Sequence, residues 1–173
     1  MISLLSISDF QTAPYKILVG KNMPEDKLTN EIHKRQKEFL LKILGYQEYY
    51  NLENDNAGLF PTTQKWIDFI NGVVYNSGSY VMDYKGILEP LKLYTYYFYQ
   101  RNNFVQPGTF GGVKMEIENG YLKLESDKMV QAWNEMVYLI GQLPTNVPTA
   151  YNYLNDNDFN ADMQIFTKIN DIF

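Results

Sequence analysis

The sequence has no cysteine and only one histidine, His33, among its 173 residues. The absence of cysteine excludes disulfide bonds, thiolate nucleophiles and zinc sites with cysteine ligands. A single imidazole also leaves no second histidine for a metal site. His33 stands beside Lys34 and Arg35 on the polar side of the first helix that we predict below. We therefore interpret it as a solvated surface residue without a catalytic role.

The sequence also lacks an excess of positive charge and any long apolar run. Twenty acidic and fifteen basic residues give a net charge of −5, which repels nucleic-acid phosphates and provides no basic surface for reading them. No apolar run approaches the roughly 20 residues that a membrane-spanning helix needs, so we expect no membrane partner. Hydrophobic residues at 45% and charged residues at 20% are typical of a globular chain with one sizeable core.

Motifs of known chemistry are missing or incomplete. The sequence contains no G-x-S-x-G, G-x-x-x-x-G-K or G-x-G-x-x-G motif. Asp156, Asp158 and Asn160 copy the first three ligand positions of a calcium loop, but Ala161 replaces the turn glycine and no glutamate occupies the last position. The glycine-rich run 108–112 opens a predicted hairpin and offers no helix N-terminus to a phosphate. We therefore expect no catalytic residues, no metal site and no cofactor, as in a protein that is not an enzyme.

Aromatic residues are abundant, at 16% of the chain with fifteen tyrosines. Tyrosine covers a large area with few rotatable bonds and keeps a polar tip, so it suits partly hydrated protein interfaces. Codon usage rich in A and T explains the same excess, because asparagine, isoleucine, lysine and phenylalanine are plentiful too. Both interpretations remain open.

The first part of the chain predicts an extended segment followed by a long helix. Residues 1–24 have little periodicity, and we expect at most one helical turn near Ser8. Apolar residues at helical spacing predict a helix over 25–44, with Gly45 just past its end. A short aromatic helix over 46–52 follows.

Three further helices are expected in the middle of the chain. The second begins after Thr62 or Thr63 as its cap. The third covers about 87–101, and its aromatic residues surround nearly the whole helix, which indicates burial on several sides. The fourth covers about 127–142. The predicted apolar stripe of the second helix contains Trp66, Phe69, Ile70, Val73 and Val74.

A β-hairpin is predicted at about 113–125. Asn119-Gly120 suits the positive φ angles of a tight hairpin turn. With these two residues as the turn, Met115 faces Leu124 and Glu116 faces Lys123, so apolar side chains share one face and opposite charges pair on the other. An isolated hairpin is marginal in water, so we expect its apolar face to pack on helices or on another subunit.

The last residues predict an arm that docks on another surface. Residues 155–158, Asn-Asp-Asn-Asp, are typical of a polar linker. Met163, Phe166 and Ile169 fit a helix, whereas Ile165 and Ile169, with Thr167 between them, fit a strand, and the pattern does not decide between the two. Docking on a partner and folding back on the same domain both remain open.

These elements together predict a mainly α fold. We expect a helical bundle of about four helices with an inserted β-hairpin and an extended C-terminal arm. The chain then divides into an extended N-terminal segment (1–24), a helical bundle domain (25–154) and a C-terminal docking arm (155–173).

Three stretches carry a resemblance to a known family. They are the run from Trp66 to Tyr75, the run from Tyr84 to Leu91 (YKGILEPL) and the aromatic run from Tyr94 to Tyr99. Their order, after the helix end at Leu44-Gly45, resembles small head–tail connector proteins of tailed bacteriophages, also called adaptor or ring proteins, especially those of phages that infect Bacteroidetes. The glycine-rich turn and the helix around Trp133 follow in the same order, so the resemblance covers about 35–155.

The resemblance implies a structural virion protein that works without catalysis. Its copies would form a homo-oligomeric ring, typically dodecameric, beneath the portal protein and above the next neck or tail protein. Genomic DNA would pass through the lumen without specific binding, and negative charge would keep DNA from sticking to the wall. The protein would lie at the head–tail interface, the neck of the virion, after synthesis in the host bacterial cytoplasm.

Six residues are the candidates for packing within or between subunits, three of them on the aromatic helix and three on the arm. They are Tyr94, Tyr97, Phe98, Phe166, Ile169 and Phe173. Two alternatives to a connector remain: another neck or tail-completion protein of the same virion, and a small monomeric protein-binding module.

Overall fold

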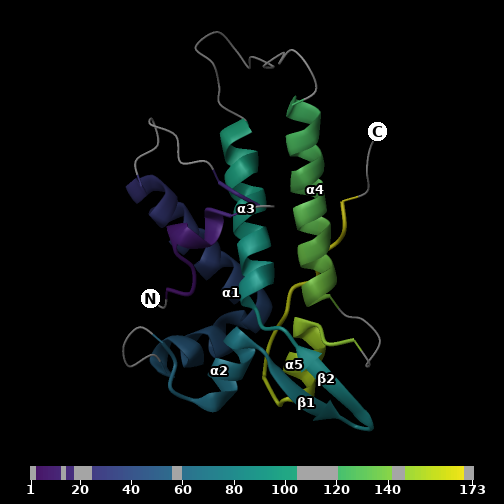
Figure 1. The fold of residues 1–173 in the computed structure, drawn as a ribbon. Helices are drawn as coiled ribbons and strands as arrows, with labels where there is room; N and C mark the ends of the chain where they lie inside the picture. Colours follow the sequence, from purple (N-terminus) through teal and green to yellow (C-terminus); the bar gives the residue numbers. More distant parts are fainter. Residues whose placement is uncertain are drawn as a thin grey trace.

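Long helices dominate the computed structural model of the chain (Figure 1), which describes residues 3–12, 15–17, 25–55, 60–104, 121–141 and 147–169. The mainly α fold class with one hairpin, as expected from the sequence, is confirmed. In chain order the elements are η1 (Ile7–Phe10, a 3₁₀ helix), α1 (Glu25–Asp55), α2 (Gln64–Asn71), β1 (Val73–Ser77), β2 (Tyr80–Tyr84), α3 (Leu88–Phe104), α4 (Tyr121–Ile140) and α5 (Ala150–Asp156).

The helix α1 is broken at Gly45, as the sequence predicts. Gly45 has φ 72° and ψ 174°, a conformation that glycine adopts without the steric penalty of a Cβ. The chain therefore forms the two helical segments that were predicted on either side of Gly45, and both belong to α1. Because the helix breaks here, carbonyl groups of the preceding turn lose their intrahelical partners. Two of them, on Lys42 and Leu44, accept hydrogen bonds from residues near the C-terminus.

The bundle is built around α3. Figure 1 shows α3 and α4 side by side along most of their length, and α3 packs against α1 on another side. This position explains why aromatic residues surround α3, since Tyr94 and Tyr96 are both fully buried. Phe39 of α1 and Met136 of α4 are buried beside them.

The N-terminal segment packs on this bundle. The turn predicted near Ser8 is η1, whose first turn is held by a hydrogen bond of 2.7 Å from the Ser6 backbone N–H to the Asp9 carboxylate. Phe10 is fully buried. The Tyr15 hydroxyl donates to Glu135 of α4 at 2.6 Å, so residues before α1 contact the far side of the bundle.

The hairpin of the described residues is formed by β1 and β2, at a place where the sequence analysis predicted helix. The strands are antiparallel, with Val73 opposite Tyr84 and Ser77 opposite Tyr80. The prediction that Val73 and Val74 continue the second helix is wrong. Gly72, with φ 90°, ends α2, and the β-branched residues that follow favour a strand.

The expectation of a strand over 121–125 is also wrong. These residues form the first turns of α4, and the other half of that predicted hairpin, 113–120, lies outside the described residues. Leucine, lysine and glutamate in this stretch are all good helix formers. In the sequence, Leu122 also stands seven residues before Met129, which is a helical spacing of apolar residues.

A short helix, α5, occupies the region where the sequence predicted the start of a linker. Thr149 caps it by accepting the Asn152 backbone N–H on its hydroxyl oxygen, at 3.3 Å. The described residues that follow α5, 157–169, form neither helix nor strand. The sequence left helix and strand open for this segment, and the structure has an extended, irregular segment instead.

Candidate protein-interaction site

Residues 160–169, called the docked arm below, pack across α1 and α4 of the same chain, on a surface called the arm groove below. On the α1 side, the Gln164 backbone N–H donates to the Lys42 carbonyl at 2.8 Å, and the Asp162 N–H donates to the Leu44 carbonyl at 3.3 Å. The Lys42 ammonium group also donates to the Gln164 side chain at 3.1 Å. The arm thus satisfies carbonyl groups that the break at Gly45 exposes.

On the α4 side, one asparagine holds the end of the docked arm. Asn134 accepts the Ile169 N–H at 2.8 Å and donates to the Ile169 carbonyl at 3.0 Å. Its amide group therefore pairs with both backbone groups of one residue, as a neighbouring strand would. The indole N–H of Trp133 adds a hydrogen bond of 2.8 Å to the Thr167 carbonyl. Side chains of α4 thus provide the hydrogen bonds that a neighbouring β-strand would otherwise form with the arm.

Phe166 is the apolar anchor of the docked arm. Its ring lies 6.0 Å from Trp133 and 6.4 Å from both Phe39 and Tyr94, measured between ring centroids. The neighbouring Ile165 points away from the groove and is 91% exposed. Phe166 and Ile165 are both large and apolar, but only Phe166 packs against the bundle.

The aromatic cluster around Trp133 gathers most of the predicted interface residues. Tyr97 lies 4.7 Å and Phe98 6.2 Å from Trp133, and both are half-buried. Tyr94 is only 1% exposed, so it belongs to the core and presents no surface to a partner. Phe166 and Ile169 are arm contacts, whereas Phe173 lies outside the described residues.

A partly buried ionic network holds Tyr94 in the core. The Arg35 guanidinium donates to Glu31 at 2.7 Å and to Glu38 at 2.8 Å, and it lies 4.6 Å from the Phe98 ring centre. Glu38 in turn accepts the Tyr94 hydroxyl at 2.7 Å. Burial, followed by this hydrogen bond, raises the pKa of Tyr94 well above its usual value. The network fixes α1 against α3 beneath the arm groove.

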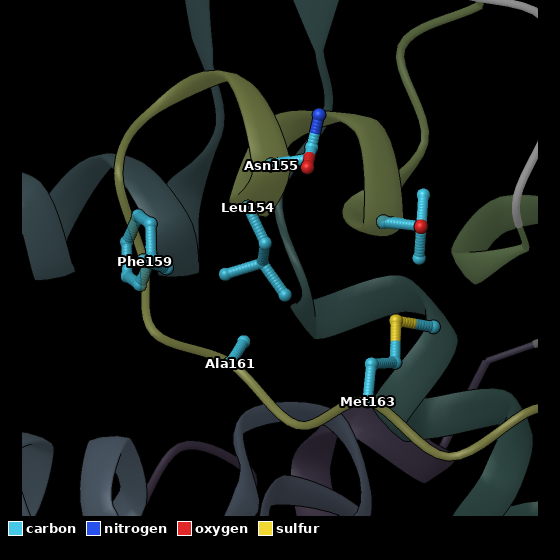
Figure 2. Close-up of a pocket in the computed structure, with 6 residues that line it drawn as sticks. Leu154, Asn155, Phe159, Ala161 and Met163 are labelled. Carbon is cyan, nitrogen blue, oxygen red and sulfur yellow. The ribbon is translucent and has the colours of Figure 1, made fainter.

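The docked arm leaves a small pocket where it departs from α5. The pocket has a volume of about 90 Å³ and is lined in part by Leu154, Phe159, Ala161 and Met163. Figure 2 shows these side chains around the space between α5 and the arm. The pocket opens to solvent, and Phe159, Ala161 and Met163 beside it pack against the hydrophobic core.

The hairpin presents a second candidate surface. Val74 and Val81 are 63% and 73% exposed, and the strand register places both on its outer face. In the part of the chain that the structure describes, neither strand has a second strand neighbour. Exposed β-branched residues next to open strand edges are typical of surfaces that contact another protein.

Sequence reasoning missed two residues of the arm groove. The sequence placed Trp133 only within the fourth predicted helix, although its indole N–H binds the arm. Asn134 carried no signal at all, because an asparagine on a helix surface is usually solvated. Their role follows from the tertiary position of the arm, which sequence spacing does not contain.

Little chemistry is organised elsewhere. His33 lies 3.4 Å from the Ser3 hydroxyl, and no carboxylate hydrogen-bonds to it among the described residues. Within the same ranges, no three histidine, aspartate or glutamate side chains come close enough to hold a metal ion. Among the residues that the structure describes, no helix combines the length and apolar character that crossing a bilayer requires.

Comparisons with known protein families, with curated proteins and with solved structures find no match.

Proposed function

We propose that this chain is a head–tail connector of a tailed bacteriophage, a structural virion protein that forms a ring beneath the portal. The proposal starts from the order of motifs over about 35–155, which resembles that of connector proteins. In this reading several copies pack side by side, and genomic DNA passes through the lumen of the ring. The partners are other copies of the chain, the portal protein and the next neck or tail protein.

The observation that carries this proposal is the pair of exposed valines, Val74 and Val81, on the outer face of the hairpin. Val74 and Val81 gain nothing from exposure to water, and burying a valine side chain contributes about 1.5–3 kcal/mol. The hairpin lies at one end of the bundle (Figure 1), away from most of α3 and α4. A projecting two-stranded element with exposed valines and open strand edges is suited to contact a neighbouring copy.

Exposed tyrosines support the same function. Tyr46 and Tyr50 are 80% and 55% exposed, four residues apart on α1, so they lie on one face of the helix. Aromatic residues with a polar tip are enriched at protein interfaces. The net charge of −5 would also limit adhesion of DNA to the ring.

Light scattering coupled to size-exclusion chromatography tests the proposal. A connector associates into a ring alone or together with the portal protein of the same phage, and Val81→Glu weakens that association. The matched control is Asn30→Glu, which adds the same charge at an exposed position of α1. If Val81→Glu and Asn30→Glu both associate like the unaltered chain, the hairpin is not the subunit contact.

One observation favours a second candidate, a monomeric protein-binding module. The docked arm already fills the groove of its own chain, so that part of the surface is complete without a partner. Such a module stays monomeric at high concentration and does not associate with the portal. The same chromatography separates the two functions.

A further inference from the structure

We propose that the docked arm is exchanged between neighbouring copies, so that residues 160–169 of one chain fill the arm groove of the next. This inference rests on the proposed ring function and names a second contact between its subunits, in addition to the hairpin. The occupant is a second copy of this chain, and the contacts are the ones that the arm makes within one chain.

The groove itself identifies this occupant. It offers two backbone carbonyls on α1, the amide group of Asn134 and the indole N–H of Trp133, all matched by backbone groups of the arm. Phe166 packs against the rings of Phe39, Tyr94 and Trp133 between them. Because every copy carries the same groove and the same arm, an exchanged arm recovers every one of these contacts.

The docked arm has no structure of its own to lose when it moves. Its described backbone hydrogen bonds run to α1 and α4, and none joins two arm residues. Asn160 follows this rule, since its N–H donates to the Glu48 side chain at 3.3 Å. Leaving the groove therefore breaks contacts with the bundle alone, and the groove of a neighbouring copy replaces them.

The joint between the arm and its own domain lies just after Phe159. The Phe159 ring packs 5.2 Å from Trp66 and 5.8 Å from Phe69, and its N–H donates to the Leu154 carbonyl. Phe159 thus stays with α2 and α5. Directly before it, Asp158 has φ 53°, a conformation that costs free energy for a residue with a Cβ. Directly after it lies the pocket of Figure 2, a small space between α5 and the arm.

Exchange requires the adjacent copy to lie directly beside the joint. The arm contacts begin at Asn160, with Glu48, and consecutive Cα atoms are about 3.8 Å apart. The Glu48 end of the neighbouring arm groove therefore lies next to Phe159 in the exchanged assembly. The exchanged contact ties subunits in sequence around a ring.

Engineered cysteines test the exchange, because the sequence contains no cysteine that would interfere. Lys42 and Gln164 are in contact through both backbone and side chains, so Lys42→Cys and Gln164→Cys place two thiols at the arm contact. Each substitution is made in a separate chain, one of them carrying a tag that changes its mass. The two chains are unfolded and refolded together at high concentration and then oxidised.

Exchange predicts a disulfide-linked heterodimer on a denaturing, non-reducing gel. Its yield should exceed by about tenfold that of a control mixture in which Lys34→Cys replaces Lys42→Cys, because docking raises the effective concentration of the matched thiols. Lys34 is exposed on α1 and makes no described contact with the arm. A chain carrying both Lys42→Cys and Gln164→Cys, oxidised when dilute, verifies that the pair forms a disulfide within one chain.

Light scattering of the same samples, alone and with the portal protein of the same phage added, separates this inference from the proposed function. If rings form but the heterodimer yield equals that of the control, the exchange is overturned and the connector function is still supported. Linked heterodimers without rings support the exchange and contradict the connector function. Neither rings nor heterodimers above the control overturns both.

Discussion

The backbones of Gly72 and Gly86 approach each other closely where the hairpin joins the bundle. Both have positive φ, 90° and 87°. A Cβ on Gly72 would stand 2.7 Å from the Lys85 carbonyl carbon, and a Cβ on Gly86 would stand 2.7 Å from the Asn71 carbonyl carbon. The two chain segments that enter and leave the hairpin therefore approach closely because neither residue has a side chain. Directly after Gly86, the Ile87 N–H donates to the Phe69 and Ile70 carbonyls, which closes the base of the hairpin.

Alanine at either glycine should destabilise the chain severely. Positive φ alone costs about 1–3 kcal/mol for a residue with a Cβ, and the backbone contact adds a clash that only movement of the strands relieves. Gly78→Ala is the matched control, since Gly78 has φ 57° but no atom within 4 Å of the added Cβ. Urea unfolding measures all three. Equal losses of unfolding free energy in the Gly72, Gly86 and Gly78 variants would show that the close approach does not affect stability.

Phe166→Ala should release the docked arm, whereas Ile165→Ala should not. Removing a fully buried phenylalanine costs roughly 3–5 kcal/mol, and we expect about 1–3 kcal/mol here because Phe166 is half-buried. The loss is local, so the measurement is the rate of tryptic cleavage after the exposed Lys168. Faster cleavage in Phe166→Ala alone is expected. Similar rates in both variants would contradict the anchoring role of Phe166.

Arg35→Lys should lower stability although it keeps the charge. Arg35 is 8% exposed and binds two glutamates at once, a geometry that one ammonium group does not reproduce. Losing a hydrogen bond to a charged group costs about 1.5–3 kcal/mol. Lys34→Ala, at the exposed neighbouring position, is the control. Unfolding curves of Arg35→Lys that overlay those of the unaltered chain would mean that the network contributes little.

Acid should weaken the junction between α1 and α2 through Asp55. Side-chain and backbone hydrogen bonds from Thr63, followed by those from Thr62, hold the pKa of Asp55 below its ordinary value of 3.8. A lowered carboxylate pKa contributes stability above that ordinary value, and the contribution disappears as pH falls through the pKa in the folded chain.

The difference in unfolding free energy between the unaltered chain and Asp55→Asn should therefore stay constant from neutral pH down to about pH 4 and shrink below it. Thr63→Ala should reduce this pH dependence in part, because the backbone donors remain. Thermal unfolding across a pH series measures both. A difference that grows as the pH falls would have the wrong sign.

The sequence predicted elements whose cause is local. Gly45 ends a helical stripe, and the structure breaks α1 at that residue. The hairpin shows the limit of such reasoning. Asn119-Gly120 is a strong turn signal, yet residues 121–125 are helical, and the hairpin forms instead at Val73–Tyr84 after Gly72. The close approach of Gly72 and Gly86 decides that location, and it joins residues fourteen positions apart.

The docked arm was undecidable from the sequence for a physical reason. Inward-facing side chains follow a spacing of two over Phe159, Ala161 and Met163, and then a spacing of three over Met163, Phe166 and Ile169. The first spacing fits a strand and the second fits a helix. Contacts with Lys42, Leu44 and Asn134 on α1 and α4 determine both spacings. These three residues are distant from the arm in the sequence.

Electron microscopy of portal particles tests the connector function most directly. The chain is mixed in excess with the portal protein of the same phage, and the particles are imaged in negative stain. The proposed function predicts an added ring of density on one end of the portal, which is reduced by Val81→Glu and retained with Asn30→Glu. Bare portals at saturating concentration would contradict a connector that binds the portal directly.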